Sequence, residues 1–86
     1  MKFITRDTDY AIQAIIYIAK QEKGKAVSVE NIVEDLGLPK QHLRLLLKKL
    51  ASEEILVSYK GKNGGFCLSK DSAEINLVDI INVFQF

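Results

Sequence analysis

The strongest periodic signal in the chain lies between about residues 40 and 52. Four leucines recur there at i, i+3, i+4 and i+7, which is the spacing of one buried helical face. They are Leu43, Leu46, Leu47 and Leu50. The opposite face is polar except for one leucine, and it comprises Gln41, Arg44, Leu45, Lys48 and Ser52. The pattern predicts an amphipathic helix with an exposed polar side.

A shorter helix is predicted just before it. Ser28 is a suitable N-cap for a helix through Leu36, and Gly37 is typical of a helix C-terminus. Pro39 suits the first turn of the following helix, where its missing N–H costs nothing. Residues 28–52 are therefore predicted to form a helix-turn-helix, because two helices joined by a short turn have that geometry.

Two further helices, at about 8–20 and 77–86, are apolar on nearly every side. Asp7 or Thr8 can cap the first and Asn76 the second. A helix that is apolar on every side is covered on every side in a folded protein. We therefore expect a second copy of the chain, or a further segment of it, to cover the surplus apolar surface.

The stretch between these helices predicts a β-hairpin. Residues 55–59 and 66–69 have the character of strands, and 60–65 is a basic link whose glycines permit positive φ. Tyr59 and Phe66 flank the link and are expected to anchor it. The predicted fold class is α+β, mainly helical: a winged helix-turn-helix with a two-stranded wing and flanking N- and C-terminal helices.

Composition narrows the class of protein. A chain of 86 residues can close only one core, so residues 1–86 are expected to form a single domain. No apolar run approaches the roughly 18 residues of a membrane helix, and the first residues lack the apolar stretch of a secretory signal. The single cysteine, Cys67, forbids an internal disulfide and fits a reducing compartment. These features favour a cytoplasmic binding module with no membrane partner.

The net charge of +1 is distributed unevenly. Residues 39–66 carry six lysines and arginines against two glutamates, a local charge of +4, whereas the segments on either side are slightly negative. The positive segment contains the leucine-backed helix and the hairpin link, the two parts that a winged helix-turn-helix presents to DNA. A charge cluster alone is usually a solvated surface. Its coincidence with this fold favours a surface that binds phosphates.

Several stretches along the chain carry a family signature. The most specific is the hairpin link with the residue after it, Lys60-Gly61-Lys62-Asn63-Gly64-Gly65-Phe66, followed by Glu74-Ile75-Asn76-Leu77. The other stretches are Thr5-Arg6, Tyr10-Ala11, Val27-Ser28, Ile32, Leu36-Gly37-Leu38, His42-Leu43, Leu46, Leu50, Leu56-Val57-Ser58, Leu68 and Asp79-Ile80. Together they cover essentially the whole chain in order. In these stretches the chain resembles the Rrf-two family of winged-helix transcription regulators.

The resemblance implies a cytoplasmic bacterial homodimer that binds a palindromic operator in double-stranded DNA. It also implies which positions face the DNA, because family recognition helices address the major groove and the wing and N-terminal segment lie beside the backbone. The residues that the resemblance assigns to DNA contact are Gln41, His42 and Arg44 on the recognition helix, Lys60, Lys62 and Asn63 in the wing, and Lys2 and Arg6 in the N-terminal segment. Lys48 is added to this set because it is a cation on the same polar helix face as Gln41 and Arg44.

Two departures from the family pattern limit what the resemblance implies. Family members continue past the point where this chain ends, with a long dimerisation helix, and the iron–sulfur sensors among them have three cysteines before it. Those cysteines are absent from residues 1–86, so no cofactor is assigned to this chain. Pro39 stands where a serine or threonine helix cap is common, which removes one expected phosphate contact.

Each candidate residue also has a plainer interpretation. Arg44 can form a bidentate pair with guanine, worth roughly 1–3 kcal/mol of discrimination, or it can be an exposed helix cation. Gln41 can read adenine or hold a phosphate, and Leu45 can touch a thymine methyl or pack against a neighbouring element. His42 is expected to pack or to contact a phosphate rather than to bind a metal. Cys67 is expected to be a small strand side chain rather than a redox-active thiol.

The sequence therefore predicts a sequence-specific DNA-binding transcriptional regulator, acting as a repressor. The alternative is a winged-helix module that docks a protein through its apolar surplus and does not bind DNA. An enzyme is not predicted, because the chain has one histidine, one cysteine and no metal-ligand spacing or phosphate-binding loop. DNA binding requires the leucine-backed helix and the lysine-tipped hairpin to project from one side of the molecule, with Arg44 exposed.

Overall fold

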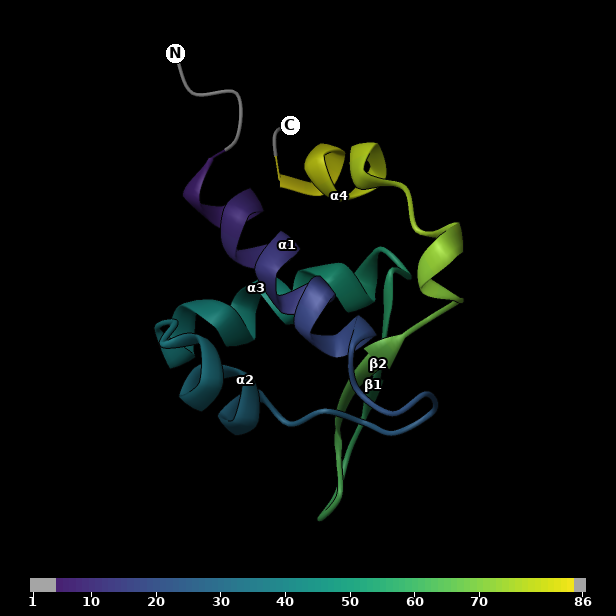
Figure 1. The fold of residues 1–86 in the computed structure, drawn as a ribbon. Coiled ribbons are helices and arrows are strands. Elements are labelled where there is room, and N and C mark those ends of the chain that lie inside the picture. Colours follow the sequence, from purple (N-terminus) through teal and green to yellow (C-terminus); the bar gives the residue numbers. More distant parts are fainter. Residues whose placement is uncertain (1–4, 85–86) are drawn as a thin grey trace.

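The computed structural model describes residues 5–84 (Figure 1). In chain order these residues form α1 (Arg6–Ala19), α2 (Val29–Leu36), α3 (Lys40–Ser52), β1 (Leu56–Tyr59), β2 (Gly65–Leu68), a short 3-10 helix (Ser72–Glu74) and α4 (Leu77–Phe84). The predicted fold class, mainly helical α+β with a two-stranded wing, is confirmed. Within the same residues no helix is long and apolar enough to cross a membrane.

The start of α1 differs from the prediction. Its N-cap is Thr5, whose side chain accepts a hydrogen bond from the backbone N–H of Thr8 at 3.2 Å. The expectation that Asp7 or Thr8 caps the helix is wrong, because both residues already lie inside it. The Thr8 side chain is fully buried and its hydroxyl lies 3.0 Å from that of Thr5. The helix therefore begins about one half-turn earlier than the polar residues suggest.

The boundaries of α2 follow the local signals in the sequence. The Ser28 hydroxyl accepts a hydrogen bond from the backbone N–H of Asn31 at 3.1 Å, which confirms Ser28 as the N-cap. Gly37 ends the helix in the left-handed conformation, with φ of 69°. Pro39 is the N-cap of α3 rather than a residue of its first turn, and it offers no side-chain hydrogen bond to that helix.

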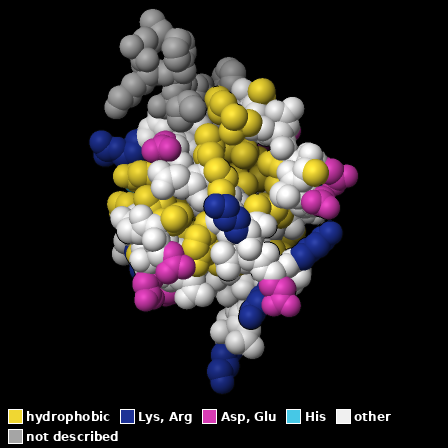
Figure 2. All heavy atoms as spheres, in the orientation of Figure 1, with side chains coloured by type: hydrophobic (Ala, Val, Ile, Leu, Met, Phe, Trp, Pro, Cys, Tyr) yellow, Lys and Arg dark blue, Asp and Glu magenta, His cyan; other side chains and the backbone are white. Residues whose placement is uncertain are grey.

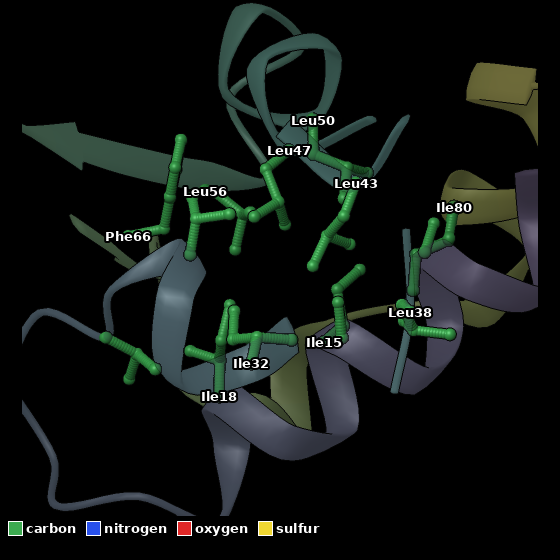
Figure 3. Packing of buried hydrophobic residues seen from close by; sticks show 14 residues of the cluster. Ile15, Ile18, Ile32, Leu38, Leu43, Leu47, Leu50, Leu56, Phe66 and Ile80 are labelled. Carbon is green, nitrogen blue, oxygen red and sulfur yellow. The ribbon is translucent and has the colours of Figure 1, made fainter. Parts of the chain in front are cut away.

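The leucine stripe of α3 forms the centre of the core. Leu43, Leu47 and Leu50 are fully buried. Figure 3 shows them pointing from α3 toward Ile15 of α1 and Ile32 of α2. The predicted inward face of this helix is confirmed. Other buried members of the core are Ala11, Ala14, Ile18, Val27, Val29, Leu38, Leu56, Phe66 and Ile80.

The hairpin is antiparallel and is joined to the body by a third short segment. Leu56 pairs with Leu68 and Tyr59 with Gly65, so each predicted strand is present within one residue of its expected bounds. Val27, which comes just before α2, makes a backbone bridge to Phe66 with N···O distances of 2.8 and 2.9 Å. Phe66 is buried, and it anchors the hairpin as predicted.

Gly65 is the residue whose lack of a side chain this junction requires. Its φ is +155°, and a Cβ atom there would overlap the carbonyl oxygen of Val27. A glycine lets the two backbones approach closely enough to form the bridge. The backbone bridge between the hairpin and Val27 thus requires glycine at position 65.

The last helix, α4, packs across α1 at the end of the molecule opposite the hairpin tip (Figure 1). Asn76 caps it as predicted, since its side-chain oxygen accepts a hydrogen bond from the backbone N–H of Val78 at 2.9 Å. The prediction extended this helix to residue 86, and residues 85–86 lie outside the described part of the chain.

The two helices expected to be covered on every side are not fully covered by the described residues 5–84. On α1, Ile16 is 49% exposed. On α4, Leu77 and Val78 are 51% and 56% exposed. Figure 2 shows apolar side chains gathered on the face where α1 and α4 meet. The surplus apolar surface predicted from the sequence is therefore present, and it faces outward.

Candidate nucleic-acid interface

The exposed side of α3 carries an unbroken row of side chains suited to contact DNA. Gln41, Arg44, Leu45 and Lys48 lie at i, i+3, i+4 and i+7, all exposed, and we call this row the recognition stripe. The Arg44 side chain is 48% exposed, as the prediction of base contact requires. Leu45 is 66% exposed, so it does not pack against a neighbouring element of the described chain.

An acidic residue that sequence reasoning missed lies against this stripe. The carboxylate of Glu30, near the start of α2, is 3.1 Å from Nζ of Lys40 and 3.8 Å from Nη2 of Arg44. Its pKa is lowered because the carboxylate accepts a hydrogen bond from its own backbone N–H, and then because it pairs with Lys40. No sequence signal identifies this contact, since Glu30 belongs to a different helix from its partners.

His42 is tied to α1. Its Nε2 lies 2.8 Å from Oδ1 of Asp7, and its ring meets the Tyr10 ring edge-on, with centroids 5.6 Å apart. The residue is half-buried. These contacts join the start of the recognition helix to the first turns of α1, and they direct one ring nitrogen away from solvent.

The hairpin tip is the second basic part of the candidate interface. Lys60, Lys62 and Asn63 are all exposed. They lie in the bend between β1 and β2, which projects from the body in Figure 1 and carries basic side chains in Figure 2. Because α3 packs directly against β1, the recognition stripe and the hairpin belong to adjoining elements.

Of the two N-terminal basic residues predicted to contact DNA, only Arg6 lies within the described part of the chain. Arg6 is exposed at the first position of α1. Its neighbour in the chain, Asp7, contacts His42 near the start of α3. Lys2, the other predicted backbone contact, lies outside the described residues.

Strand β2 of the hairpin holds the only cysteine of the sequence. Cys67 is a free thiol of intermediate burial, and a hydrogen bond with it raises the pKa of Tyr59. Tyr59 is 52% exposed, so the expectation that it anchors the hairpin is wrong. Both residues line an open cavity of about 350 Å³ between the hairpin and the C-terminal end of α1.

The described residues do not form a metal centre. Residues 5–84 contain no group of three or more histidine, cysteine, aspartate or glutamate side chains placed to hold a metal ion. Cys67 is also the only thiol in the full sequence. Iron held by several protein ligands therefore does not fit the residues that this structure describes.

A helix-turn-helix followed by a basic hairpin defines the chain as a winged-helix protein, a class built to place one helix in the major groove. The chain belongs to the Rrf2 family, described as iron-dependent transcriptional regulators, whose pattern matches residues 4–85. Members of this family are DNA-binding regulators of transcription and not enzymes. The family resemblance seen in the sequence is thus confirmed.

Solved structures of related proteins have the same fold. CymR (YrzC), the global cysteine regulator of B. subtilis, is 26% identical with a TM-score of 0.92 over 99% of this chain. IscR of T. potens is 28% identical with a TM-score of 0.88 over 98%. The oxidized form of CymR from Staphylococcus aureus is 30% identical with a TM-score of 0.85 over 96%.

These relatives are longer than the present chain. The chain spans 66% of the B. subtilis CymR structure, 61% of the T. potens IscR structure and 66% of the S. aureus CymR structure. The likeness therefore covers their winged-helix part, and what the remaining third of each relative does is not transferred to this chain.

Proposed function

We propose that this protein is a bacterial, cytoplasmic transcriptional repressor that binds a palindromic operator in double-stranded DNA as a homodimer. The observation that carries the proposal is the recognition stripe on α3, which is exposed along its whole length and held in place by four buried leucines. The basic hairpin tip on the adjoining element supplies a second DNA contact.

The stripe and the tip have different tasks. Arg44 reads a guanine in the major groove, while Gln41 reads an adjacent base or holds a phosphate, and Leu45 meets a thymine methyl. Lys48, like Lys60 and Lys62 at the tip, neutralises phosphates and releases counterions. The remaining proposed backbone contacts are Asn63, Arg6 and Lys2.

His42 has two roles in this proposal: it contacts a phosphate, and it holds α3 to α1. Its Nε2 is occupied by Asp7, so only its other ring nitrogen is available to a phosphate. The Asp7 contact holds α3 at a fixed angle to α1, and this fixes where the recognition stripe enters the groove. A small error in that angle would displace Arg44 from its base.

The exposed apolar surface and the geometry of DNA both support the proposal of a homodimer. Ile16 on α1 and Leu77 and Val78 on α4 are about half exposed or more. Burying such apolar surface stabilises an assembly by about 25 cal/mol per Å². To contact successive turns of one face of the duplex, the two recognition helices of such a dimer must lie about 34 Å apart. Occupying a promoter in this way would exclude the polymerase.

The proposal is tested by selecting duplexes from a random-sequence pool and measuring binding of the selected duplex at several salt concentrations. Lys62→Ala should weaken binding to every sequence and reduce the salt slope by about one unit. Arg44→Ala should relax preference at one base pair, worth about 1–3 kcal/mol. Lys20→Ala, at the far end of α1, is the matched lysine control. Failure of the wild-type dimer to enrich any sequence would exclude the proposal.

A second candidate function is supported by the same exposed apolar residues on α1 and α4. In that case the winged helix docks another protein and its hairpin is only solvated. This alternative predicts no salt-dependent affinity for duplex DNA, so the titration that tests the repressor also tests it.

A further inference from the structure

Glu30 lies where an acidic side chain is least expected, at the edge of a surface proposed to bind an anion. It is the second residue of α2, yet its carboxylate bridges to α3 by pairing with Lys40 at 3.1 Å and Arg44 at 3.8 Å. A single carboxylate thus spans the two helices of the helix-turn-helix. It engages Arg44, the residue of the recognition stripe with the greatest capacity to read a base.

The contact lies at the N-terminal end of α3. Lys40 is the first residue of the helix and Arg44 lies one turn further on, so Glu30 flanks the N-terminal half of α3. In helix-turn-helix proteins the N-terminal residues of the recognition helix contact base edges. The three side chains remain 48–60% exposed, so a duplex can reach all of them.

Stability is a poor explanation for this arrangement. Ion pairs between solvent-exposed side chains contribute little to folding, because water and side-chain entropy offset the attraction. Their effect on a bound polyanion is larger. A carboxylate between two cations cancels part of the field that attracts phosphates, and it restricts the directions in which the Arg44 guanidinium can point.

Resting on the proposed DNA-binding function, we propose that Glu30 is a positioning residue that sets sequence specificity. On mixed-sequence DNA it repels the backbone and keeps Lys40 and Arg44 from forming indiscriminate phosphate contacts. On the operator, Arg44 exchanges part of its contact with Glu30 for a bidentate contact with guanine, which offsets the repulsion. Discrimination between sites arises in part from such a repulsive element, not only from attractive contacts.

The decisive variant is Glu30→Gln, which removes the charge and keeps the size of the side chain. Its matched control is Glu34→Gln on the same helix, because Glu34 is also exposed and forms no salt bridge with another described residue. Both variants change the net charge equally. They differ in whether the lost charge is paired with Lys40 and Arg44.

The measurement compares the selected duplex with a mixed-sequence duplex of equal length, across a salt series. Glu30→Gln should tighten binding to the mixed duplex about five-fold and steepen its salt slope by about one unit. The ratio of selected to mixed affinity should fall by a similar factor. Glu34→Gln should leave that ratio unchanged. In an Arg44→Ala background, adding Glu30→Gln should no longer lower the ratio.

Each result separates the two proposals. If the wild type binds its selected duplex but Glu30→Gln and Glu34→Gln have equal ratios, the specificity role of Glu30 is excluded while DNA binding stands. If Glu30→Gln still lowers the ratio of selected to mixed affinity in the Arg44→Ala background, Glu30 does not act through Arg44. That result would also overturn the inference. If the wild type selects no sequence, DNA binding fails, and the role of Glu30 fails with it.

Discussion

The helices α3 and α4 are both rich in apolar residues, yet they present opposite kinds of surface. On α3 the four leucines of one face are all buried, and the opposite face is polar except for Leu45. On α4 the one buried residue is Ile80, while Leu77 and Val78 stay more than half exposed. The first helix therefore has a free side suited to a polyanion, and the second has a free side suited to a protein surface.

The difference comes from the neighbours of each helix. α3 is surrounded on its leucine side by α1, α2 and β1, which together absorb its whole apolar stripe. α4 meets mainly α1, with a smaller contact to α3. Its eight residues include six apolar ones, and one side of a short helix cannot place all six against the same neighbours. The apolar residues of α4 that its neighbours do not bury form a surface suited to contact with another protein.

The largest expected effect is a loss of folding stability, which a comparison of two leucines on α3 tests. Leu47→Ala should lower the free energy of unfolding by about 3 kcal/mol, because the side chain is fully buried and leaves a cavity. Leu45→Ala should change stability by less than about 0.5 kcal/mol and yet weaken operator binding. Urea unfolding and a DNA titration measure the two quantities. Equal losses of stability would contradict the division of α3 into a buried and a free side.

The attachment of the hairpin to the body is tested at Gly65. Gly65→Ala should destabilise the fold by about 2 kcal/mol, because the added Cβ meets the Val27 carbonyl and the positive φ disfavours a side chain. Gly61→Ala at the tip is the control, since its φ is also positive but the space around it is open. It should cost only about 1 kcal/mol. Thermal unfolding of both variants isolates the contact with Val27.

The apolar side is tested by making α4 polar. Leu77→Gln combined with Val78→Gln should weaken self-association by at least about tenfold, because both side chains would be buried in a dimer. Val57→Gln is the control, since Val57 is also an exposed apolar residue but lies on the hairpin. Sedimentation equilibrium measures the association constant. An unchanged constant would place the dimer interface elsewhere or exclude a dimer through this face.

Local signals predicted most of the fold. The leucine spacing of α3, the Ser28 cap and the Gly37 terminus each act within a few residues of chain, and each is confirmed. The start of α1 was harder, because Thr5, Asp7 and Thr8 are all good caps and only the packing of Thr8 into the core selects Thr5.

The sequence alone could not predict the tertiary contacts made by the residues of the candidate site. Glu30 lies 14 residues before Arg44, and Asp7 lies 35 residues before His42, so neither pair follows from helical periodicity. The same is true of the bridge between Val27 and Phe66. The sequence identifies which residues α3 exposes, whereas tertiary packing decides which of them are free and which are held by a partner.

The smallest expected effect is the pH-dependent stability contributed by the Glu30 carboxylate. The pKa of Glu30 is lowered in the folded state, first by its own backbone N–H and then by Lys40. A carboxyl group with a lowered folded pKa adds stability that is present above its ordinary pKa of 4.5 and is lost as pH falls through the folded value. The wild type should therefore exceed Glu30→Gln slightly in stability at about pH 7, and this difference should be smaller at about pH 3. Urea titrations at the two pH values measure this difference. A gap of equal size at both pH values would mean that folding does not lower the pKa of Glu30, which would contradict both its backbone hydrogen bond and its pairing with Lys40.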